Sequence, residues 1–173
     1  MAIWQLTMAI IKPHIIKNPV SCTKIKELIL SSNFKIVLYK RKTISICEAE
    51  DFYYEHQHKF FYNRLLTFIT SGPSDILVLT KENAIADWRR LMGPTKVFKA
   101  QFEAANTIRG QYGLSDTRNA THGSDSEQSA EREIKIFFPE FNMDKWFGEK
   151  EPLFRSDKVI FLEDQFKHEV VLR

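Results

Sequence analysis

The sequence predicts a mixed α/β fold, more specifically an α+β sandwich in which helices cover an antiparallel sheet of split β-α-β topology. Three observations support this class. A chain of 173 residues is long enough for one well-buried domain. Its composition, 43% apolar and 27% charged, is typical of a soluble globular protein. The expected elements then follow the order strand, helix, strand, helices, strand, helix, loop, helix.

The first three elements are a strand, a helix and a second strand. Apolar residues occupy nearly every position from 4 to 11, which predicts a strand buried on both faces and closed by Pro13. Apolar residues then repeat at helical spacing between 19 and 32, and Asn33 suits a left-handed stop. Alternation over residues 34–39 predicts the second strand.

Two helices are expected next. The segment Ser45–Glu48 has the form of a capping box, in which the serine and glutamate side chains each satisfy a free backbone amide. A helix should therefore begin there and run to about His56. Apolar residues continue at helical spacing from 61 to 68 on a further helix, which Ser71-Gly72-Pro73 stops.

The middle of the chain adds a third strand, a helix and a long connection. Residues 76–79 are all apolar and predict a buried strand, and the helix over 85–92 ends at Gly93-Pro94. The stretch 95–119 is expected to be irregular. It is longer than most connections in compact domains, and its basic residues favour a functional loop.

The C-terminal part begins with a second apparent capping box, Ser124–Glu127, which should open a helix that Pro139 stops. The apolar face of this helix carries alanine, isoleucine and phenylalanine. Beyond it, residues 158–163 predict an edge strand, and residues 165–173 fit either a strand or a short helix.

Composition excludes several classes of function. The net charge of +3 suits anionic substrates such as nucleotides but falls far short of a nucleic-acid-binding stripe. The two cysteines form no disulfide framework and have no metal-binding spacing, which indicates a reducing compartment. No apolar run approaches the roughly 20 residues that span a bilayer. We therefore expect neither a nucleic-acid nor a membrane partner.

The stretch RNATHGSDS, residues 118–126, places one histidine among small and polar residues. Two interpretations of His122 follow: an exposed loop residue or a catalytic one. If Ser124 caps the next helix, the free amides and the positive dipole end there favour an anion beside the imidazole. Neutral imidazole is a competent nucleophile towards phosphorus, so the catalytic interpretation is phosphoryl transfer through a phosphohistidine.

Glu133 and several cations favour the catalytic interpretation. On the expected helix Glu133 borders the apolar face, where a carboxylate needs a partner, and orienting the imidazole would provide one. Taken alone, it would be a solvated helix residue. Lys12 comes at the end of the first strand, Arg89 and Thr95 flank LMGPT, and Arg109 lies in TIRG. Phosphoryl transfer needs several converging cations, which these residues could supply. Singly each is an ordinary surface residue, and only the combination points to a site.

Other catalytic motifs are missing from the sequence. It contains no Walker-type glycine loop and no G-x-G-x-x-G. No Ser-His-Asp or Cys-His arrangement has supporting context. His56 and His58, two positions apart on an expected helix, would not face one site and should be solvated.

Several motifs together resemble the nucleoside diphosphate kinase family. NATHGSDS occurs with IIKP, FF, SGP, LMGPT, TIRG and SAEREI, in the family order, from Thr7 to Phe138. The chain looks most similar to the divergent type-6 branch, in which FFP is followed by a C-terminal extension. The resemblance implies a ferredoxin-like sandwich with a four-stranded antiparallel sheet. It also implies a kinase-like domain at residues 1–140 and an extension at residues 141–173 that packs on it or trails from it.

The resemblance further implies an activity, the ping-pong exchange of the γ-phosphate between nucleoside triphosphates such as ATP and nucleoside diphosphates. It implies Mg²⁺ bound through the nucleotide phosphates, with no dedicated protein metal site. A nucleotide-binding regulatory module with weak or partner-dependent phosphotransfer is the rival interpretation. The matching residues are His122 as the phosphorylated histidine, Glu133 as its support, Ser124 and Tyr53 beside it, Lys12, Arg89, Thr95 and Arg109 at the phosphates, Asn119 and Lys12 at the ribose, and Phe60 at the base.

Three departures from the family pattern bear on binding and assembly. Asp116 stands where the family has an apolar residue against the base, and Lys59 stands where a proline usually precedes the double phenylalanine. The loop over 95–109 is a few residues longer than the common form. That loop shapes trimer contacts in hexameric members, so its length counts against the family hexamer, and oligomerisation and a protein partner stay open. Relatives of this branch indicate an intracellular location, mitochondrial or cytoplasmic.

Overall fold

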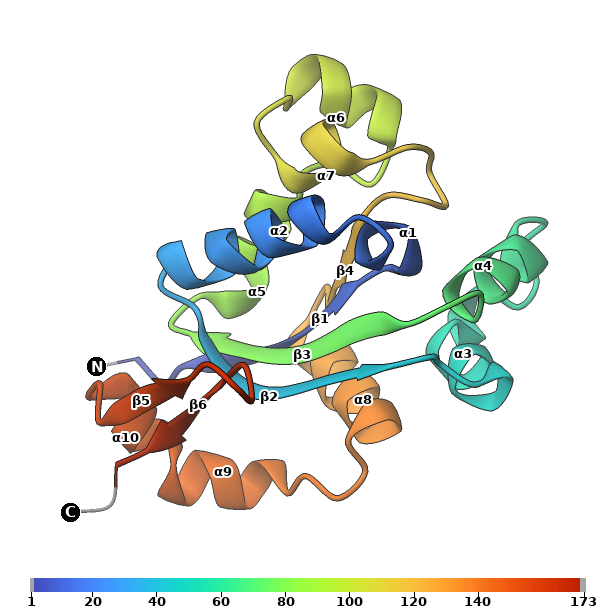
Figure 1. The fold of residues 1–173 in the computed structure, drawn as a ribbon. Coiled ribbons are helices and arrows are strands. Elements are labelled where there is room, and N and C mark those ends of the chain that lie inside the picture. Colours follow the sequence, from blue (N-terminus) through green and yellow to red (C-terminus); the bar gives the residue numbers. More distant parts are fainter. Residues whose placement is uncertain (1, 172–173) are drawn as a thin grey trace.

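The computed structural model describes residues 2–171 and has a four-stranded sheet at its centre, with helices on both faces (Figure 1). The strand order is β2-β3-β1-β4 and each neighbouring pair is antiparallel, which confirms the predicted fold class. The elements are β1 (Gln5–Ile11), α1 (Pro13–Ile16), α2 (Pro19–Ser31), β2 (Lys35–Lys42), α3 (Ile46–Phe52), a 3₁₀ turn (Tyr54–His56), α4 (Tyr62–Ile69), β3 (Ser74–Lys81), α5 (Ala84–Met92), α6 (Val97–Glu103), α7 (Ile108–Tyr112), β4 (Thr121–Gly123), α8 (Glu127–Phe137), α9 (Met143–Glu149), α10 (Glu151–Arg155), β5 (Val159–Leu162) and β6 (Lys167–Val170).

The central strand β1 is buried on both faces, as predicted. Met8 and Ile10 belong to one core cluster with residues of α3 and α8, and Ala9 and Ile11 belong to a second cluster with residues of α2 and α5. Successive side chains of a strand point to opposite faces, so β1 contributes to both cores. The sheet is therefore held between two apolar layers, and its edge strand β4 is fixed relative to both.

Two of the expected helix boundaries are confirmed. The Ser45 hydroxyl accepts a hydrogen bond from the Glu48 amide at 3.2 Å, and the Glu48 carboxylate accepts one from the Ser45 amide at 2.9 Å. Asn33 ends α2 with a φ of 62°. The helix from the capping box ends at Phe52, however, and the separate 3₁₀ turn carries the chain to His56.

The second expected capping box is wrong. Helix α8 begins at Glu127, and its N-cap is Ser126, whose hydroxyl accepts from a backbone amide one turn further on. Ser124 is fully buried before the helix, and its hydroxyl accepts from the Met8 amide at 3.0 Å. The S-x-x-E pattern favoured Ser124, but the sheet contact with β1 uses its hydroxyl instead.

The stretch 95–119 is not irregular. It contains the short helices α6 and α7, which bury Val97, Ala100 and Ile108. Each helix is too short to show a clear apolar period, so its sequence resembles a loop. The three-residue strand β4 was missed among the residue patterns for the same reason, and it carries His122.

The C-terminal segment folds against the edge of the sheet. Trp146 of α9 and Phe154 of α10 join the core cluster that contains Met8. The expected edge strand is β5, and it pairs with β6, which forms in the segment that allowed a strand or a helix. Residues 172–173 of that segment lie outside the described residues. Strand β6 lies beside β2, where the Ile36 amide donates to Nδ1 of His168 at 2.9 Å (Figure 1).

No helix within residues 2–171 is long and apolar enough to cross a bilayer.

His168 should make folding sensitive to acid. Burial, and next the charge of Lys35, lower the pKa of His168 to about 4 from 6.5. The folded chain therefore binds fewer protons than the unfolded chain, so this contribution is present above pH 6.5 and is lost as the pH falls towards 4. His168→Gln keeps an acceptor for Ile36 without titrating. Between pH 7 and pH 4 we expect the unfolding free energy of this variant to fall by about 1–3 kcal/mol less than that of the parent chain.

Urea unfolding from pH 7 to pH 4 measures the difference between the variant and the parent chain. The control is His58→Gln, which changes an exposed histidine and should leave the pH dependence as it is. Parallel curves for the parent and His168→Gln would contradict the prediction.

Candidate active site

One cavity of about 650 Å³ gathers almost all of the sequence-predicted site residues. It opens between the α3–α4 segment, the C-terminal end of α5, and β4. Ser124 lies buried beneath it and is not part of the lining. The predicted residues that line the cavity are Lys12, Tyr53, Phe60, Arg89, Thr95, Arg109, Asn119, His122 and Glu133.

These residues come from segments that the fold brings to one end of the sheet. Lys12 directly follows β1, and its amide donates to the carbonyl of Ala120 just before β4. His122 is the middle residue of β4 and pairs with Ile10 of β1. Glu133 lies on α8 and Arg89 on α5, which cover opposite faces of the sheet (Figure 1). The cavity therefore receives side chains from both layers.

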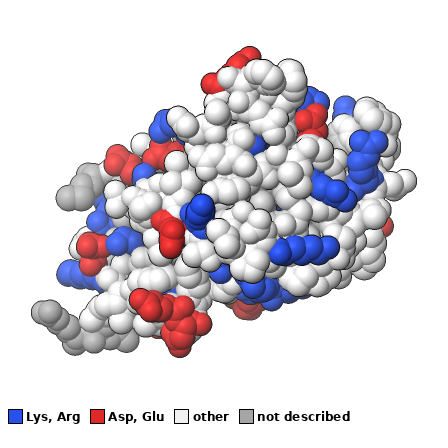
Figure 2. Space-filling model, turned by 45° about the horizontal axis from the view of Figure 1, so that its top comes forward, with Lys and Arg blue, Asp and Glu red and all other residues white. Residues whose placement is uncertain are grey.

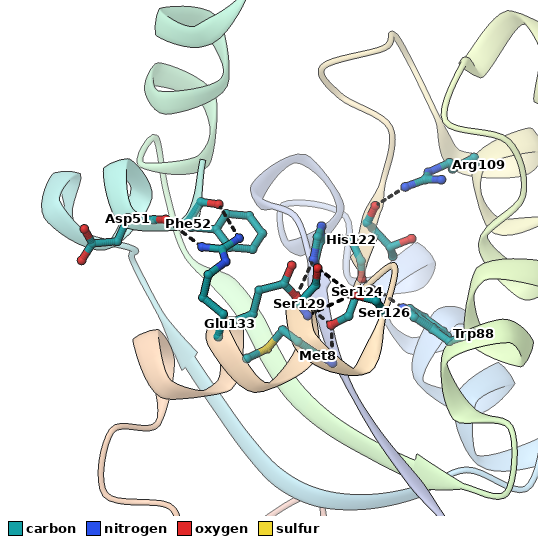
Figure 3. Close-up of polar contacts among 12 residues, drawn as sticks. Met8, Asp51, Phe52, Trp88, Arg109, His122, Ser124, Ser126, Ser129 and Glu133 are labelled. Atoms are coloured by element: carbon teal, nitrogen blue, oxygen red, sulfur yellow. Dashed lines mark hydrogen bonds and ion pairs between the residues drawn. The ribbon is translucent and has the colours of Figure 1, made fainter. Parts of the chain in front are cut away.

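His122 is held by a buried carboxylate. Its Nε2 lies 3.1 Å from Oε2 of Glu133, and the Ser124 hydroxyl donates to the same oxygen at 2.7 Å (Figure 3). Glu133 is only 4% exposed, so an ionised carboxylate there needs both hydrogen bonds. The carboxylate favours the tautomer with the proton on Nε2, which leaves a lone pair on Nδ1. Nδ1 forms no hydrogen bond with any residue in the range 2–171.

Aromatic side chains pack around the imidazole. The ring of Phe52 meets the His122 ring edge-on, with centroids 4.7 Å apart, and it also contacts Phe137. Tyr53 is buried next to them. Its burial, followed by the charge of Glu133, raises the pKa of the Tyr53 hydroxyl above its usual value. Tyr53 therefore remains a protonated donor at the cavity wall.

Sequence reasoning missed Phe52 and Trp88 as neighbours of His122. Phe52 precedes Tyr53 at the end of α3, where an aromatic residue is most often a core residue. Trp88 donates its indole N–H to the backbone carbonyl of His122 at 3.0 Å. A side chain that contacts a backbone atom leaves no pattern in a sequence, although the position of Trp88 directly before Arg89 was visible.

Two cations are buried in the cavity wall. Lys12 is 5% exposed and donates to Oδ1 of Asn119 at 2.7 Å. Arg109 is 8% exposed and donates to the carbonyls of Gly93 and Thr121, at 2.9 and 3.1 Å. No carboxylate in residues 2–171 forms an ion pair with either.

Burial and a neighbouring cation disfavour the charged form of each of these two side chains. Burial, and next the charge of Arg109, lower the pKa of Lys12 to about 7. Burial, and next the charge of Arg89, lower the pKa of Arg109 to about 10. A bound anion would offset both the desolvation and the repulsion. The wall is therefore suited to a polyphosphate.

The outer end of the cavity is open and aromatic. Phe60 is 90% exposed at its rim. Asp116 also lines the cavity, but its carboxylate is engaged by the Lys96 ammonium at 2.9 Å and the Val97 amide at 3.1 Å. An aromatic face is thus free to stack a planar group, whereas the carboxylate across the cavity is tied to α6.

The two histidines that were expected to be solvated, His56 and His58, differ in their exposure. His58 is exposed as predicted, but His56 is half-buried and lines the cavity beside Phe61, so the prediction of a solvated side chain is wrong for it. The chain forms a separate 3₁₀ turn here instead of continuing the helix, and this turn brings His56 inward.

Positive charge predominates outside the cavity as well. Figure 2 shows more Lys and Arg than Asp and Glu over the half of this face that carries α3 and α4. Among residues 2–171, no group of three or more His, Cys, Asp or Glu side chains is placed to hold a metal ion.

Comparisons with known proteins agree on one family. The model of the nucleoside diphosphate kinase family matches residues 5–143. A nucleoside diphosphate kinase 6 from Xenopus tropicalis is 47% identical over 95% of this chain and 92% of its own length. The human nucleoside diphosphate kinase 6 is 44% identical over 96% of this chain and 89% of its own length. A nucleoside diphosphate kinase from Geobacter sp. is 45% identical over 80% and 98%.

Solved structures give the same result. The nucleoside diphosphate kinase from Aquifex aeolicus is 35% identical and has a TM-score of 0.75 over 78% of this chain and 95% of its own. That from Halobacterium salinarum, in complex with CDP, is 35% identical and has a TM-score of 0.72 over 78% and 87%.

The fold and the site together define a ferredoxin-like α+β protein with a carboxylate-held histidine in a cation-lined cavity. The chain belongs to the nucleoside diphosphate kinase family. Within that family it belongs to the type-6 branch.

Lys12 should make nucleotide affinity depend on pH. In the free protein Lys12 loses its proton around pH 7, and a bound polyphosphate raises that pKa because it favours the charged form. Binding energy from Lys12 is therefore fully present below pH 7 and decreases as the pH rises from 7 to 9. We expect the dissociation constant of ADP to increase about tenfold over that range.

Titration calorimetry at several pH values, in two buffers of different ionisation enthalpy, measures both the affinity and the proton uptake. Lys12→Met should remove the pH dependence and weaken binding. Because this variant also removes a buried charge, it should raise the free energy of unfolding by about 1–3 kcal/mol. A parent chain whose ADP affinity stays constant from pH 7 to 9 contradicts the prediction.

Proposed function

We propose that this protein is an active nucleoside diphosphate kinase, which transfers the γ-phosphate of ATP or another nucleoside triphosphate to a nucleoside diphosphate through a phosphohistidine on His122. The observation that supports this most is the Nε2 contact to Glu133, which leaves Nδ1 available within the cation-lined cavity. The family membership and the CDP complex of the Halobacterium salinarum relative give further support.

In the proposed first half-reaction, the lone pair on Nδ1 of His122 forms a bond to the γ-phosphorus. The bond from that phosphorus to the bridging oxygen breaks, and the electron pair leaves with the nucleoside diphosphate. The proton on Nε2 stays in its hydrogen bond to Glu133, which stabilises the positive charge that develops on the ring. A second nucleoside diphosphate then takes the phosphoryl group by the reverse steps, so no proton is released overall.

The other residues of the cavity bind and orient the nucleotide in this proposal. Lys12, Arg89 and Arg109 offset the negative charge of the phosphates, and Asn119, held by Lys12, reaches the ribose. Tyr53 and Thr95 complete the wall around the γ-phosphate, and Phe60 stacks the base.

Mg²⁺ would be bound through the phosphates of the nucleotide and would supply positive charge against the leaving group. The cavity fits a metal-bound nucleotide, because its lining offers Lys12, Arg89 and Arg109 to the phosphates.

The regulatory alternative is favoured by one observation, the ion-paired Asp116 where an apolar residue would have packed on the base. A weakened base site would lower turnover and increase dependence on a protein partner. That partner, the oligomeric state and a mitochondrial or cytoplasmic location stay predictions.

Labelling with [γ-³²P]ATP tests the proposed intermediate. The chain should take up acid-labile, alkali-stable phosphate, and His122→Ala should lose it because no nucleophile remains. His56→Ala is the matched control, since His56 lines the same cavity without contact to Glu133, and it should keep the label. Label on His122→Ala would overturn the assignment. Clean nucleotide binding without exchange of ATP and GDP would favour the regulatory alternative.

Phe60 should contribute to binding without selecting a base. Its exposed ring offers a stacking face and no hydrogen-bonding group. We expect Phe60→Ala to raise the apparent KM for purine and pyrimidine nucleotides by a similar factor, about 10-fold, as measured by steady-state exchange. An effect confined to purines or to pyrimidines would show that base edges are read.

A further inference from the structure

Trp88 is a large, fully buried side chain outside the cavity lining, and it contacts the nucleophile's backbone. It lies on α5, packs edge-on against Phe34 with centroids 6.1 Å apart, and belongs to the core cluster of α2 and α5. Its indole N–H donates to the carbonyl of His122 at 3.0 Å (Figure 3). One side chain therefore connects the core on one face of the sheet with the residue whose imidazole points to the other face.

Gly123 makes this contact close. A Cβ at Gly123 would lie 2.5 Å from Cδ1 and 2.8 Å from Nε1 of Trp88, so the indole lies directly against the glycine backbone. Because side chains alternate along β4, Gly123 faces Trp88 while His122 faces Glu133. A small residue is thus needed after His122, because Trp88 packs against it on the face opposite to Glu133.

Helix α5 also carries a phosphate-site residue. Arg89 directly follows Trp88 and lines the cavity. Gly93 ends the same helix, and its carbonyl accepts from Arg109 of α7. Arg109 also donates to the carbonyl of Thr121 and so joins α5 to β4 a second time. Trp88 and Arg109 together fix α5 to β4 at two neighbouring carbonyls.

We propose that Trp88 is a positioning residue, which holds α5 against β4 through the His122 carbonyl and Gly123 and thereby sets Nδ1 of His122 relative to Arg89. The inference rests on the proposed function, because it assigns Trp88 to the alignment of nucleophile and phosphate. A misplacement of about 1 Å between reacting groups can lower a rate a hundredfold. Ground-state binding uses several cations at once and depends less on this one distance.

The test compares two tryptophans in the full-length chain. Trp88→Phe removes the indole N–H and keeps an aromatic ring, and Gly123→Ala displaces the indole from the other side. Trp146→Phe is the matched control. Trp146 is also buried, at 3% exposed, but it lies in α9 and its Nε1 has no hydrogen-bond partner among the described residues. Both substitutions truncate a core tryptophan, so a merely structural role would affect both alike.

Two readouts are measured, the single-turnover rate of His122 phosphorylation by ATP and the hydrogen exchange of the amides of residues 121–124. Trp88→Phe and Gly123→Ala should lower the rate about tenfold, with less than a twofold change in the ATP concentration that gives half the maximal rate. Both should also accelerate exchange in β4. Trp146→Phe should change neither readout.

Equal rates and equal β4 exchange in Trp88→Phe and Trp146→Phe would overturn the positioning role. A parent chain that takes no label would instead refute the proposed function. In that case the exchange of β4 decides whether Trp88 holds the strand, and unchanged exchange in both Trp88→Phe and Gly123→Ala would overturn it.

Discussion

The site depends on one buried carboxylate. Glu133 accepts hydrogen bonds at a single oxygen from the Ser124 hydroxyl and from Nε2 of His122. Ser124 in turn accepts from the Met8 amide, so α8, the end of β4 and β1 are joined by three consecutive hydrogen bonds. An ionised carboxylate at this depth is stable only with such partners. The same bonds that satisfy the carboxylate select the tautomer of His122, so folding of the chain also fixes which ring nitrogen keeps a lone pair.

The opposite wall of the cavity is held in an unfavourable state by the rest of the fold. Lys12 and Arg109 are buried close together without a carboxylate partner among the described residues. Repulsion between them opposes folding, and the two apolar clusters on either side of the sheet offset it. A bound anion would relieve this repulsion, and the two side chains are already held in place by Asn119 and by backbone carbonyls.

Residue patterns predicted the long strands and most helices but not the short elements that build the site. Buried β1 and the capped α3 have strong local signals. The segments α6, α7 and β4 hold only a few residues each, and tertiary contacts fix them. Glu133 was predicted from its place beside an apolar face, whereas Trp88 could not be, because its contact is to a backbone carbonyl. The role of Ser124 was misread because two structures, a helix cap and a sheet contact, compete for one hydroxyl.

The C-terminal hairpin has a consequence for solubility. An outer strand of a sheet exposes free amides and carbonyls that can recruit strands from other chains into aggregates. At β2 the Ile36 amide is already taken by His168, and β6 lies alongside. The opposite outer strand, β4, spans only Thr121–Gly123 and has two carbonyls engaged by Arg109 and Trp88. Both outer strands of the sheet are therefore poor templates for added strands: the C-terminal hairpin covers β2, and side chains around His122 occupy carbonyls of β4.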